Sequence, residues 1–498
     1  MTRLVPYSFE LPGDRLRGRA TAGVMKIGLS QVVRVTVQFG SVVMLSRLLS
    51  PSDFGLLAMM WPVIGFVGLF QELGLTQAVV QRAQVTQAEV SALFCVSLGV
   101  SIGLAALLVV TSPLVTWFYG ESRVGPLTAA MSVNVILSGA GSLHYALLSR
   151  RMQFGAMAAI DACAAVGGLM ASVTSALLYH SFWALYAGVV VAALISTVGL
   201  WIATGWWPSL PRLSPGVGAA LRYGGNVTGF NVANFFARNL DNVLIGRAWG
   251  ERPLGLYDRA YRLMMLPLLQ VNAPIARVML PVLSRMASEP QRYGPVFLRM
   301  MAQMLLVTLP GIAFMVGTGD VLIPILLGRQ WADATPIFVA LGMAGFLQAL
   351  NNPTGWLLMS QNRTRDYMHW GVFSSITCAV SFFIGLPYGP FGVAVAYAVG
   401  EYLRTPILWW YTTRRGPVSF GNVIRMALPH FSGAVASVAA ILGMRALVSM
   451  EPHLVLGTSL ILSFLVSGAV LALFSGGRAT IMQSVALIRS LVPPAALS

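Results

Sequence analysis

Polar side chains recur at helical spacing within two otherwise apolar stretches of this 498-residue sequence. In the later stretch, at steps of three, four and three residues, they are Asn231, Asn234, Arg238 and Asp241. The same spacing 200 residues earlier gives Gln31, Arg34, Gln38 and Ser41. Residues so spaced share one face of an α-helix. Because guanidinium groups bind anionic oxygens and amide side chains bind hydroxyls, each face could bind a polar, anionic ligand.

These two polar faces have two interpretations. An arginine in mid-membrane costs at least about 2.5–3.5 kcal/mol unless it faces water or a partner, so both faces are expected to point into the protein. In one interpretation, Arg238 and Asp241 neutralise each other and the asparagines bond neighbouring helices. In the other, the faces line a hydrated central cavity. Their matching positions favour the cavity.

The next apolar stretch adds polar residues to the same predicted cavity. Arg262, Gln270 and Arg277 fall within about a quarter of the circumference of one helix. Arg262 lies near the end of the stretch and could instead extend its charged group to the membrane surface. Arg277 lies deeper and is the stronger candidate for the cavity.

Three carboxylates within apolar stretches could relay protons or sodium ions, namely Asp161, Asp241 and Glu401. Intramembrane acidic groups are rare and often belong to such relays. Glu401 also lies three residues before Arg404, a spacing that equally suits a structural salt bridge. Both roles stay open for Glu401.

The elements that must position these residues are transmembrane helices. Hydrophobic residues make up 56% of the chain, charged residues 10%, and the mean hydropathy is +0.75, whereas soluble domains carry roughly a quarter charged residues. Stretches of about twenty apolar residues can cross a hydrocarbon core. Fourteen candidates are 24–46, 54–76, 89–117, 125–148, 155–179, 182–204, 221–246, 256–282, 295–317, 334–358, 369–387, 391–411, 428–447 and 454–474. We therefore predict an all-α polytopic membrane protein with about 14 transmembrane helices.

The distribution of arginines predicts the orientation, because cytoplasmic loops are enriched in basic residues. Lys26 is the only lysine among the 32 basic residues. With the N-terminus in the cytoplasm, the cytoplasmic connections carry most of the arginines, so both termini are predicted to be cytoplasmic. The first apolar stretch has no cleavage site after it and is expected to be retained.

An internal repeat relates the two halves of the chain. Shifted by 200 residues, Val43, Arg47, Gly55 and Leu56 match Val243, Arg247, Gly255 and Leu256. Further along the chain, Leu114–Gly120 resembles Leu322–Gly328. A repeat of six spans, an even number, predicts parallel units. We expect two parallel six-helix lobes around a central cavity plus two C-terminal helices, although duplicated bundles can also be scaffolds.

This repeat predicts six segments along the chain. They are a cytoplasmic N-terminal segment (1–23), an N-lobe with spans 1–6 (24–204), a cytoplasmic linker (205–220), a C-lobe with spans 7–12 (221–411), spans 13–14 (412–474) and a cytoplasmic tail (475–498).

Signatures of enzymes and of metal or nucleic-acid sites are missing from the sequence. It contains no GxxxxGK[ST] loop, HExxH, GxSxG or GxGxxG. The three cysteines, Cys95, Cys163 and Cys378, lie in apolar stretches without ligand or disulfide spacing. The arginines are spread between spans and not gathered on a solvated face. We expect no catalytic residue, cofactor, metal or nucleic-acid partner.

Several motifs resemble a known family. They are Leu240-Asp241-Asn242 with Ile245-Gly246-Arg247, the segment Leu254–Ala260 (LGLYDRA) and the segment Pro281–Arg285 (PVLSR), supported by Leu45–Gly55 and Leu148–Phe154. Together they resemble Wzx-type polysaccharide flippases, in the exopolysaccharide and colanic-acid branch of the multidrug/oligosaccharidyl-lipid/polysaccharide (MOP) exporter superfamily. The resemblance covers most of residues 20–415.

The resemblance implies a cargo and a mechanism. An oligosaccharide repeat unit on undecaprenyl diphosphate would move by alternating access from the cytoplasmic to the periplasmic leaflet of the bacterial inner membrane, for exopolysaccharide biosynthesis. The diphosphate would bind Arg34, Arg238 and Arg277, and the sugar hydroxyls would bind Gln31, Gln38, Asn231 and Asn234. Further implied partners are membrane lipid, a polysaccharide polymerase and a co-polymerase. We expect a monomer and an acidic, xanthan-type polysaccharide.

Three alternatives stay open. A cation-coupled multidrug exporter of the same superfamily would be expected to carry fewer cavity arginines. A peptidoglycan-precursor flippase would also favour a cationic cavity, so charge does not separate it. The third is a membrane assembly factor that transports nothing and has an incidental polar core.

Overall fold

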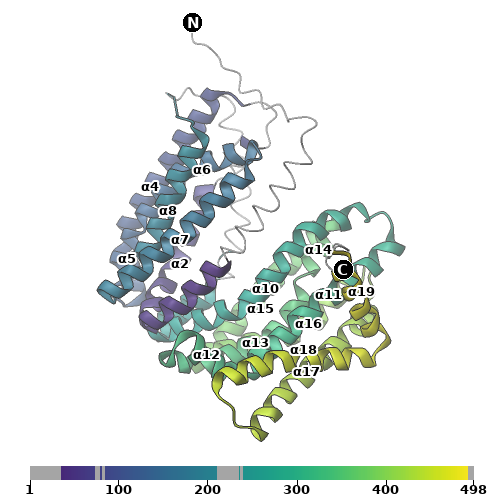
Figure 1. Ribbon diagram of the computed structural model, residues 1–498. Helices are drawn as coiled ribbons and strands as arrows, with labels where there is room; N and C mark the ends of the chain where they lie inside the picture. Colours follow the sequence, from purple (N-terminus) through teal and green to yellow (C-terminus); the bar gives the residue numbers. More distant parts are fainter. Residues whose placement is uncertain (1–34, 73–78, 81–84, 210–234, 236–238, 492–498) are drawn as a thin grey trace, which may run out of the picture. The chain divides into compact units, whose positions relative to one another are not determined.

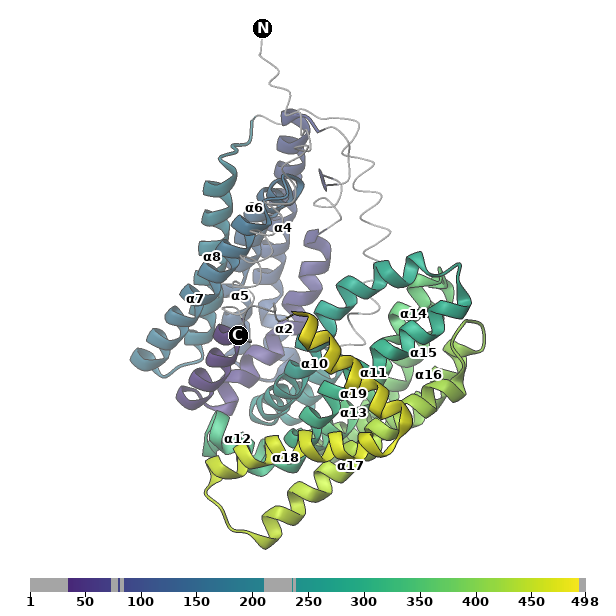
Figure 2. The same cartoon turned by 45° about the vertical axis from the view of Figure 1, so that its right-hand side comes forward.

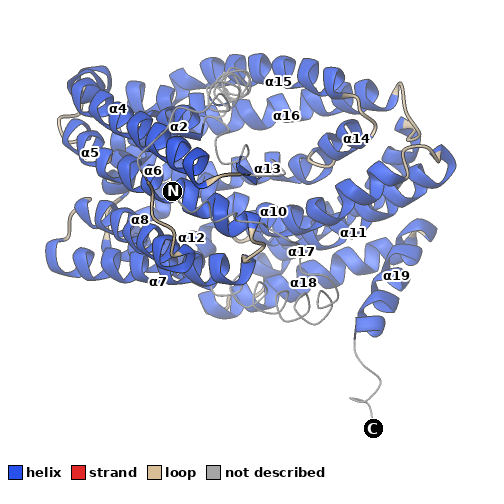
Figure 3. Ribbon diagram, turned by 90° about the horizontal axis from the view of Figure 1, so that it is seen from above, coloured by secondary structure: helices blue, strands red, loops and turns tan. Residues whose placement is uncertain are grey.

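The computed structural model describes residues 35–72, 79–80, 85–209, 235 and 239–491. Every regular element in this part of the chain is a helix, as Figure 3 shows, which confirms the all-α prediction. The chain divides into two compact units, one running to Gly255 and the other starting at Leu256.

The first unit is a bundle of helices, most of them long. They include residues 35–48, α2 (Pro51–Glu72), α4 (Gln87–Tyr119), α5 (Val124–Ala130), α6 (Ser132–Arg150), α7 (Phe154–Tyr179), α8 (Trp183–Thr204) and residues 239–249. Within this unit α7 packs along α8, and α6 packs against both α4 and α8 (Figure 1).

Local sequence signals set the ends of α4. The Thr86 hydroxyl accepts a hydrogen bond from the Glu89 N–H (3.3 Å), and the Glu89 carboxylate accepts one from the Thr86 N–H (3.0 Å). This capping box satisfies two backbone donors at the helix start. At the other end Gly120 has φ 70°, a left-handed conformation that glycine adopts without strain.

The second unit contains the rest of the helices. After α10 (Glu251–Arg285), which begins just before the unit boundary, they are α11 (Pro290–Gly317), α12 (Gly319–Leu327), η1 (Arg329–Ala334), α13 (Thr335–Asn351), α14 (Thr354–Ser360), α15 (Thr364–Gly385), η2 (Leu386–Tyr388), α16 (Gly389–Thr413), α17 (Phe420–Leu447), α18 (Pro452–Leu473) and α19 (Ser475–Leu491). α17 packs along α11 and α18, α16 packs against α13 and α15, and α19 contacts α11, α17 and α18 (Figure 2).

Serine hydroxyls join the last two long helices to the bundle. Ser437 on α17 donates to the carbonyl oxygen of Ser463 on α18 (2.8 Å). Ser463 in turn donates to the carbonyl oxygen of Pro310 on α11 (2.6 Å). Small residues allow close approach of helices, and interhelical hydrogen bonds hold them together inside a membrane.

The described chain contains ten segments that are long and apolar enough to cross a membrane, judged by length and composition. One of them, Thr364–Thr413, holds both α15 and α16. α10 covers the predicted span 256–282 but is less apolar than these ten. The predicted spans 24–46 and 221–246 lie partly outside the described residues. A multi-pass membrane protein is thus confirmed, and the count of 14 stays a prediction.

Two predicted spans are interrupted. The stretch 125–148 consists of α5 and α6, which meet at Met131, and the stretch 334–358 consists of α13 and α14. Pro353 explains the second interruption, because proline has no backbone N–H to continue the hydrogen bonds of α13.

The 200-residue repeat is visible in the helix boundaries. α2 begins at Pro51 and α10 at Glu251, so Gly55 and Gly255 occupy the same position in their helices. The second pair of similar segments also has matching ends, because Gly120 and Gly328 terminate α4 and α12 with φ angles of 70° and 105°. The internal likeness therefore extends from residue identities to local structure.

The two matched glycines lie where the first turns of α2 and α10 touch. A Cβ on Gly55 would lie 1.7 Å from the carbonyl oxygen of Glu251, and one on Gly255 would lie 1.9 Å from that of Pro51. Both neighbours are backbone atoms, which cannot rotate away as a side chain can. Glycine is therefore required at both positions for this approach of the helices.

We expect Gly55→Ala and Gly255→Ala each to destabilise the folded protein by about 1–3 kcal/mol, the usual cost of overpacking. A lowered melting temperature in detergent would show the effect. The matched control is Gly68→Ala in the same helix, α2, where an added Cβ meets no atom within 4 Å. Equal melting temperatures for all three variants would contradict the close approach.

Candidate functional site

Much of the predicted cavity face lies outside the described residues. These residues are Gln31, Arg34, Asn231, Asn234 and Arg238, and of Arg277 only the backbone, within α10, is described. The match between the two polar faces therefore stays a prediction.

The described members of the two faces differ in exposure. Gln38 is exposed, and its carbonyl oxygen accepts a hydrogen bond from the Ser41 hydroxyl (2.8 Å). Asp241 is only 7% exposed, and its Oδ1 accepts a hydrogen bond from the Asn242 N–H (2.9 Å). An exposed amide within a membrane span needs a hydrated surface, whereas a buried carboxylate needs partners within the protein.

α10 carries a line of polar residues along its length. At 100° per residue, Arg259, Gln270 and Arg277 lie within about 20° of one line on the helix, and Arg262 lies about 60° away. Arg259 is half-buried and was not among the predicted cavity residues, although its spacing from Gln270 and Arg277 is readable in the sequence. The line makes Arg259 a stronger candidate than Arg262.

Arg262 has a partner on its own helix. Its Nε donates to Oδ2 of Asp258 (2.7 Å), one turn earlier, and its side chain is 48% exposed. The salt bridge neutralises part of the charge that the sequence had assigned to the cavity. Whether Arg262 also binds cargo does not follow from this contact, so that role stays a prediction.

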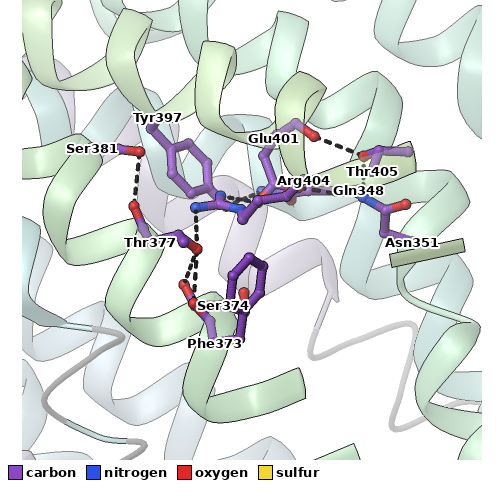
Figure 4. Close-up of polar contacts among 10 residues, drawn as sticks. All are labelled: Gln348, Asn351, Phe373, Ser374, Thr377, Ser381, Tyr397, Glu401, Arg404 and Thr405. Carbon is purple, nitrogen blue, oxygen red and sulfur yellow. Dashed lines mark hydrogen bonds and ion pairs between the residues drawn. The ribbon is translucent and has the colours of Figure 1, made fainter. Parts of the chain in front are cut away.

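A buried polar network surrounds Glu401 and Arg404 on α16 (Figure 4). Arg404 Nη2 lies 2.6 Å from Glu401 Oε1, and the two side chains are 6% and 13% exposed. The other carboxylate oxygen, Oε2, accepts a hydrogen bond of 3.4 Å from Asn351 Nδ2 on α13. Asn351 Nδ2 also donates to the Thr405 hydroxyl (2.7 Å), so the network connects α13 with α16.

The network extends from Arg404 to α15 and along α16. Arg404 Nη1 lies 3.4 Å from the Thr377 hydroxyl on α15, and its guanidinium carbon lies 5.8 Å from the centre of the Tyr397 ring. The Tyr397 hydroxyl accepts a hydrogen bond from Gln348 Nε2 on α13 (2.7 Å). Figure 4 shows these side chains gathered between the helices. The arginine thus has a carboxylate, a hydroxyl and an aromatic face around it.

These contacts meet the requirements of a buried salt bridge. A proton or sodium relay would use the same carboxylate, so the coupling role of Glu401 stays a prediction. Of the other two candidates, Asp161 on α7 is exposed and Asp241 is buried. The spacing of Tyr397, Glu401 and Arg404 could have indicated a polar face on α16, but nothing local pointed to Gln348 and Asn351 as partners.

A third group of charges lies in the first unit, beyond the end of α4. Arg123 Nε donates to Glu121 Oε1 (2.7 Å), and Arg123 Nη2 lies 3.3 Å from Glu251 Oε1 at the start of α10. The hydrogen bond from Arg123 lowers the pKa of Glu121 below its ordinary value of 4.5. The same partner carboxylate raises the pKa of Arg123, so both stay charged at neutral pH.

Solved structures of membrane transporters share this fold. The chain is similar to the lipid II flippase MurJ in an inward closed conformation, with a TM-score of 0.73 and 12% identity, covering 90% of this chain and 98% of that chain. It is also similar to an inward-facing multidrug resistance MATE family transporter of the MOP superfamily, with a TM-score of 0.60 and 15% identity. This match covers 80% of this chain and 98% of that chain. The chain therefore shares the fold of these two transporters.

Sequence comparison assigns the family. The model of the polysaccharide biosynthesis protein family matches residues 44–336, and the chain belongs to this family. One relative, the lipopolysaccharide biosynthesis protein WzxC of Escherichia coli, is 21% identical over 78% of this chain and 80% of its own length. Another, the teichuronic acid biosynthesis protein TuaB of Bacillus subtilis, is 25% identical over 67% of this chain and 70% of its own length. These findings confirm the resemblance to Wzx-type proteins.

The buried ion pair leads to a prediction about stability. Arg404→Met leaves the Glu401 carboxylate buried without its cation, which is expected to cost about 3–5 kcal/mol. The double variant Glu401→Gln/Arg404→Met leaves no unpaired charge and is expected to recover most of that loss. Thermal melting of both variants in detergent measures this, and a wild-type melting temperature for Arg404→Met would argue against the pair.

The charge group at Glu121 leads to a prediction about pH. Because its folded pKa is depressed, Glu121 contributes stability that is present above pH 4.5 and is lost as the pH falls through the folded pKa. Melting temperatures from neutral pH down to about pH 3 should fall more steeply for the wild type than for Glu121→Gln. Parallel curves for the two proteins would contradict this contribution.

Proposed function

We propose that this protein is a flippase for undecaprenyl-diphosphate-linked oligosaccharide repeat units in exopolysaccharide biosynthesis. The lipid tail stays in the bilayer while the charged head group passes through the protein interior by alternating access. The direction is from the cytoplasmic to the periplasmic leaflet.

The observation that carries this proposal is the family match across residues 44–336. Two of the relatives are named for the biosynthesis of a lipopolysaccharide and of teichuronic acid. A third, from Rhizobium meliloti, is named a succinoglycan biosynthesis transport protein and is 28% identical over 64% of each chain. All three names refer to biosynthesis, and the third name also refers to transport, which supports the proposed transport step.

The polar line on α10 supplies the chemistry that such a cargo requires. We assign the diphosphate to Arg34, Arg238 and Arg277, together with Arg259, because guanidinium groups bind phosphate oxygens through paired hydrogen bonds. Gln31, Gln38, Asn231, Asn234 and Gln270 would bind sugar hydroxyls. Arg262, which is paired with Asp258, would act at the rim of the cavity.

Two parallel lobes, 24–204 and 221–411, would rock about the cavity, with spans 13 and 14 outside them. Ion coupling would use Asp161, Asp241 or Glu401, through the protonation or cation binding of a carboxylate. The protein would act as a monomer in the bacterial inner membrane with both termini in the cytoplasm. It would perform no catalysis and deliver its cargo to a polymerase and co-polymerase.

Flipping in proteoliposomes tests the proposal directly. The purified protein is reconstituted with lipid-linked oligosaccharide, and exposure of the sugar to an external glycosidase is followed over time. Arg259→Gln is expected to slow flipping roughly ten- to hundredfold, the value of one charge-assisted hydrogen bond to phosphate. The matched control is Arg262→Gln, which removes the same charge one turn away and is expected to act much more weakly.

Two results would separate the function from the site. No flipping by the wild-type protein would overturn the proposed function, and export of a cationic drug by the same liposomes would favour the multidrug exporter. Wild-type flipping with equal rates for Arg259→Gln and Arg262→Gln would leave the function standing and reject the assignment of Arg259.

A further inference from the structure

A cavity of about 300 Å³ lies in the second unit between α11, α17 and the start of α19. This volume is at the lower end of the range for small-molecule sites. α11 and α17 run in the same direction beside it, because Arg445 near the end of α17 donates to the carbonyl oxygen of Gly317 at the end of α11 (2.8 Å). The cavity therefore lies at the end of this bundle where α11 and α17 begin and α18 ends.

The cavity wall is cationic and polar on one side. Arg425 and Asn422 lie in the first two turns of α17, and neither side chain forms a hydrogen bond or ion pair within the described part of the chain. His430, about one and a half turns beyond Arg425, is 3% exposed, and its Nε2 has no hydrogen-bond partner among the described residues. None of the nine lining residues is acidic. A wall with cationic and polar groups and no acidic group favours binding of an anionic ligand.

The other side of the cavity is apolar or formed by backbone. Leu298 and Met426 supply apolar surface, and Gly476 at the start of α19 leaves open space where a larger residue would carry a side chain. α19 is held in place by Gln303 on α11, whose Nε2 donates to the carbonyl oxygen of Thr480 (3.1 Å) and whose Oε1 accepts from the Ser484 hydroxyl. The cavity is thus closed on one side by an ordered helix.

The position of the cavity indicates where its ligand comes from. Arg425 lies within about 8 Å of the start of α17, a helix long and apolar enough to cross a membrane, so we expect it at the depth of lipid head groups. A ligand at this depth can place a phosphate on Arg425 and Asn422 and a short apolar portion against Leu298 and Met426. We propose that this cavity binds the phosphate of an anionic glycerophospholipid head group, at a site separate from the cargo path.

The test measures phospholipid binding to the purified full-length protein in detergent. Phosphatidylglycerol and phosphatidylcholine with identical acyl chains are compared by native mass spectrometry or by quenching of intrinsic tryptophan fluorescence. The wild type is expected to prefer phosphatidylglycerol. Arg425→Gln and, independently, Gly476→Leu, which fills the cavity without altering charge, are each expected to weaken that binding roughly tenfold.

Two matched controls keep the result specific. Arg299→Gln removes an exposed charge from α11 that does not line the cavity, and Gly457→Leu adds the same side chain to an open position on α18. Both controls should bind phosphatidylglycerol like the wild type, and melting temperatures check that all variants are folded.

Three outcomes would overturn the proposal. Unchanged phosphatidylglycerol binding in folded Arg425→Gln and Gly476→Leu would exclude the cavity as the site. Equal loss in the two controls would indicate a general surface effect. Binding of soluble glycerol 3-phosphate as tightly as the lipid would identify a soluble phosphate ester as the ligand in place of the membrane.

Discussion

The cost of an unpaired polar group in hydrocarbon governs this architecture. Apart from short breaks such as those at Met131 and Pro353, the described backbone within the predicted spans is helical, because a helix satisfies its own N–H and C=O groups. Side chains obey the same constraint. Ser437 and Ser463 donate to backbone carbonyl groups of neighbouring helices, and Arg404 has Glu401 and Thr377 beside it. These polar residues inside the protein therefore stabilise the fold by joining helices.

α10 is the helix to which we assign a direct role in transport. Arg259, Gln270 and Arg277 recur along one line of this helix, and polar groups at membrane depth need water or partners within the protein. The first turn of the same helix is packed as closely as backbone atoms allow, through Gly255 against α2. One helix thus combines a tightly packed start with polar residues that we propose bind the diphosphate head group of the cargo.

At the membrane surface the constraint relaxes, and charges can remain accessible. Arg123 pairs with Glu121 and Glu251 beyond the end of α4, where water screens the charges and the pair contributes modestly. Arg425 lies at a comparable kind of boundary in the second unit but faces a cavity instead of a carboxylate. Because their surroundings differ, the two arginines have different roles. Arg123 holds segments together, and Arg425 binds an anionic head group in our proposal.

The sequence by itself determined the fold class, the repeat and the ends of helices such as α4, because these depend on local chemistry. Apolar stretches specify spans, Thr86, Glu89 and Gly120 specify the ends of α4, and the offset between Gly55 and Gly255 marks two related helices. Only the tertiary structure decided which distant residues meet. Asn351 and Gln348 join Glu401 and Tyr397 across some fifty residues, and the glycines touch each other's helices. Such contacts depend on the register between packed helices, which no local spacing encodes.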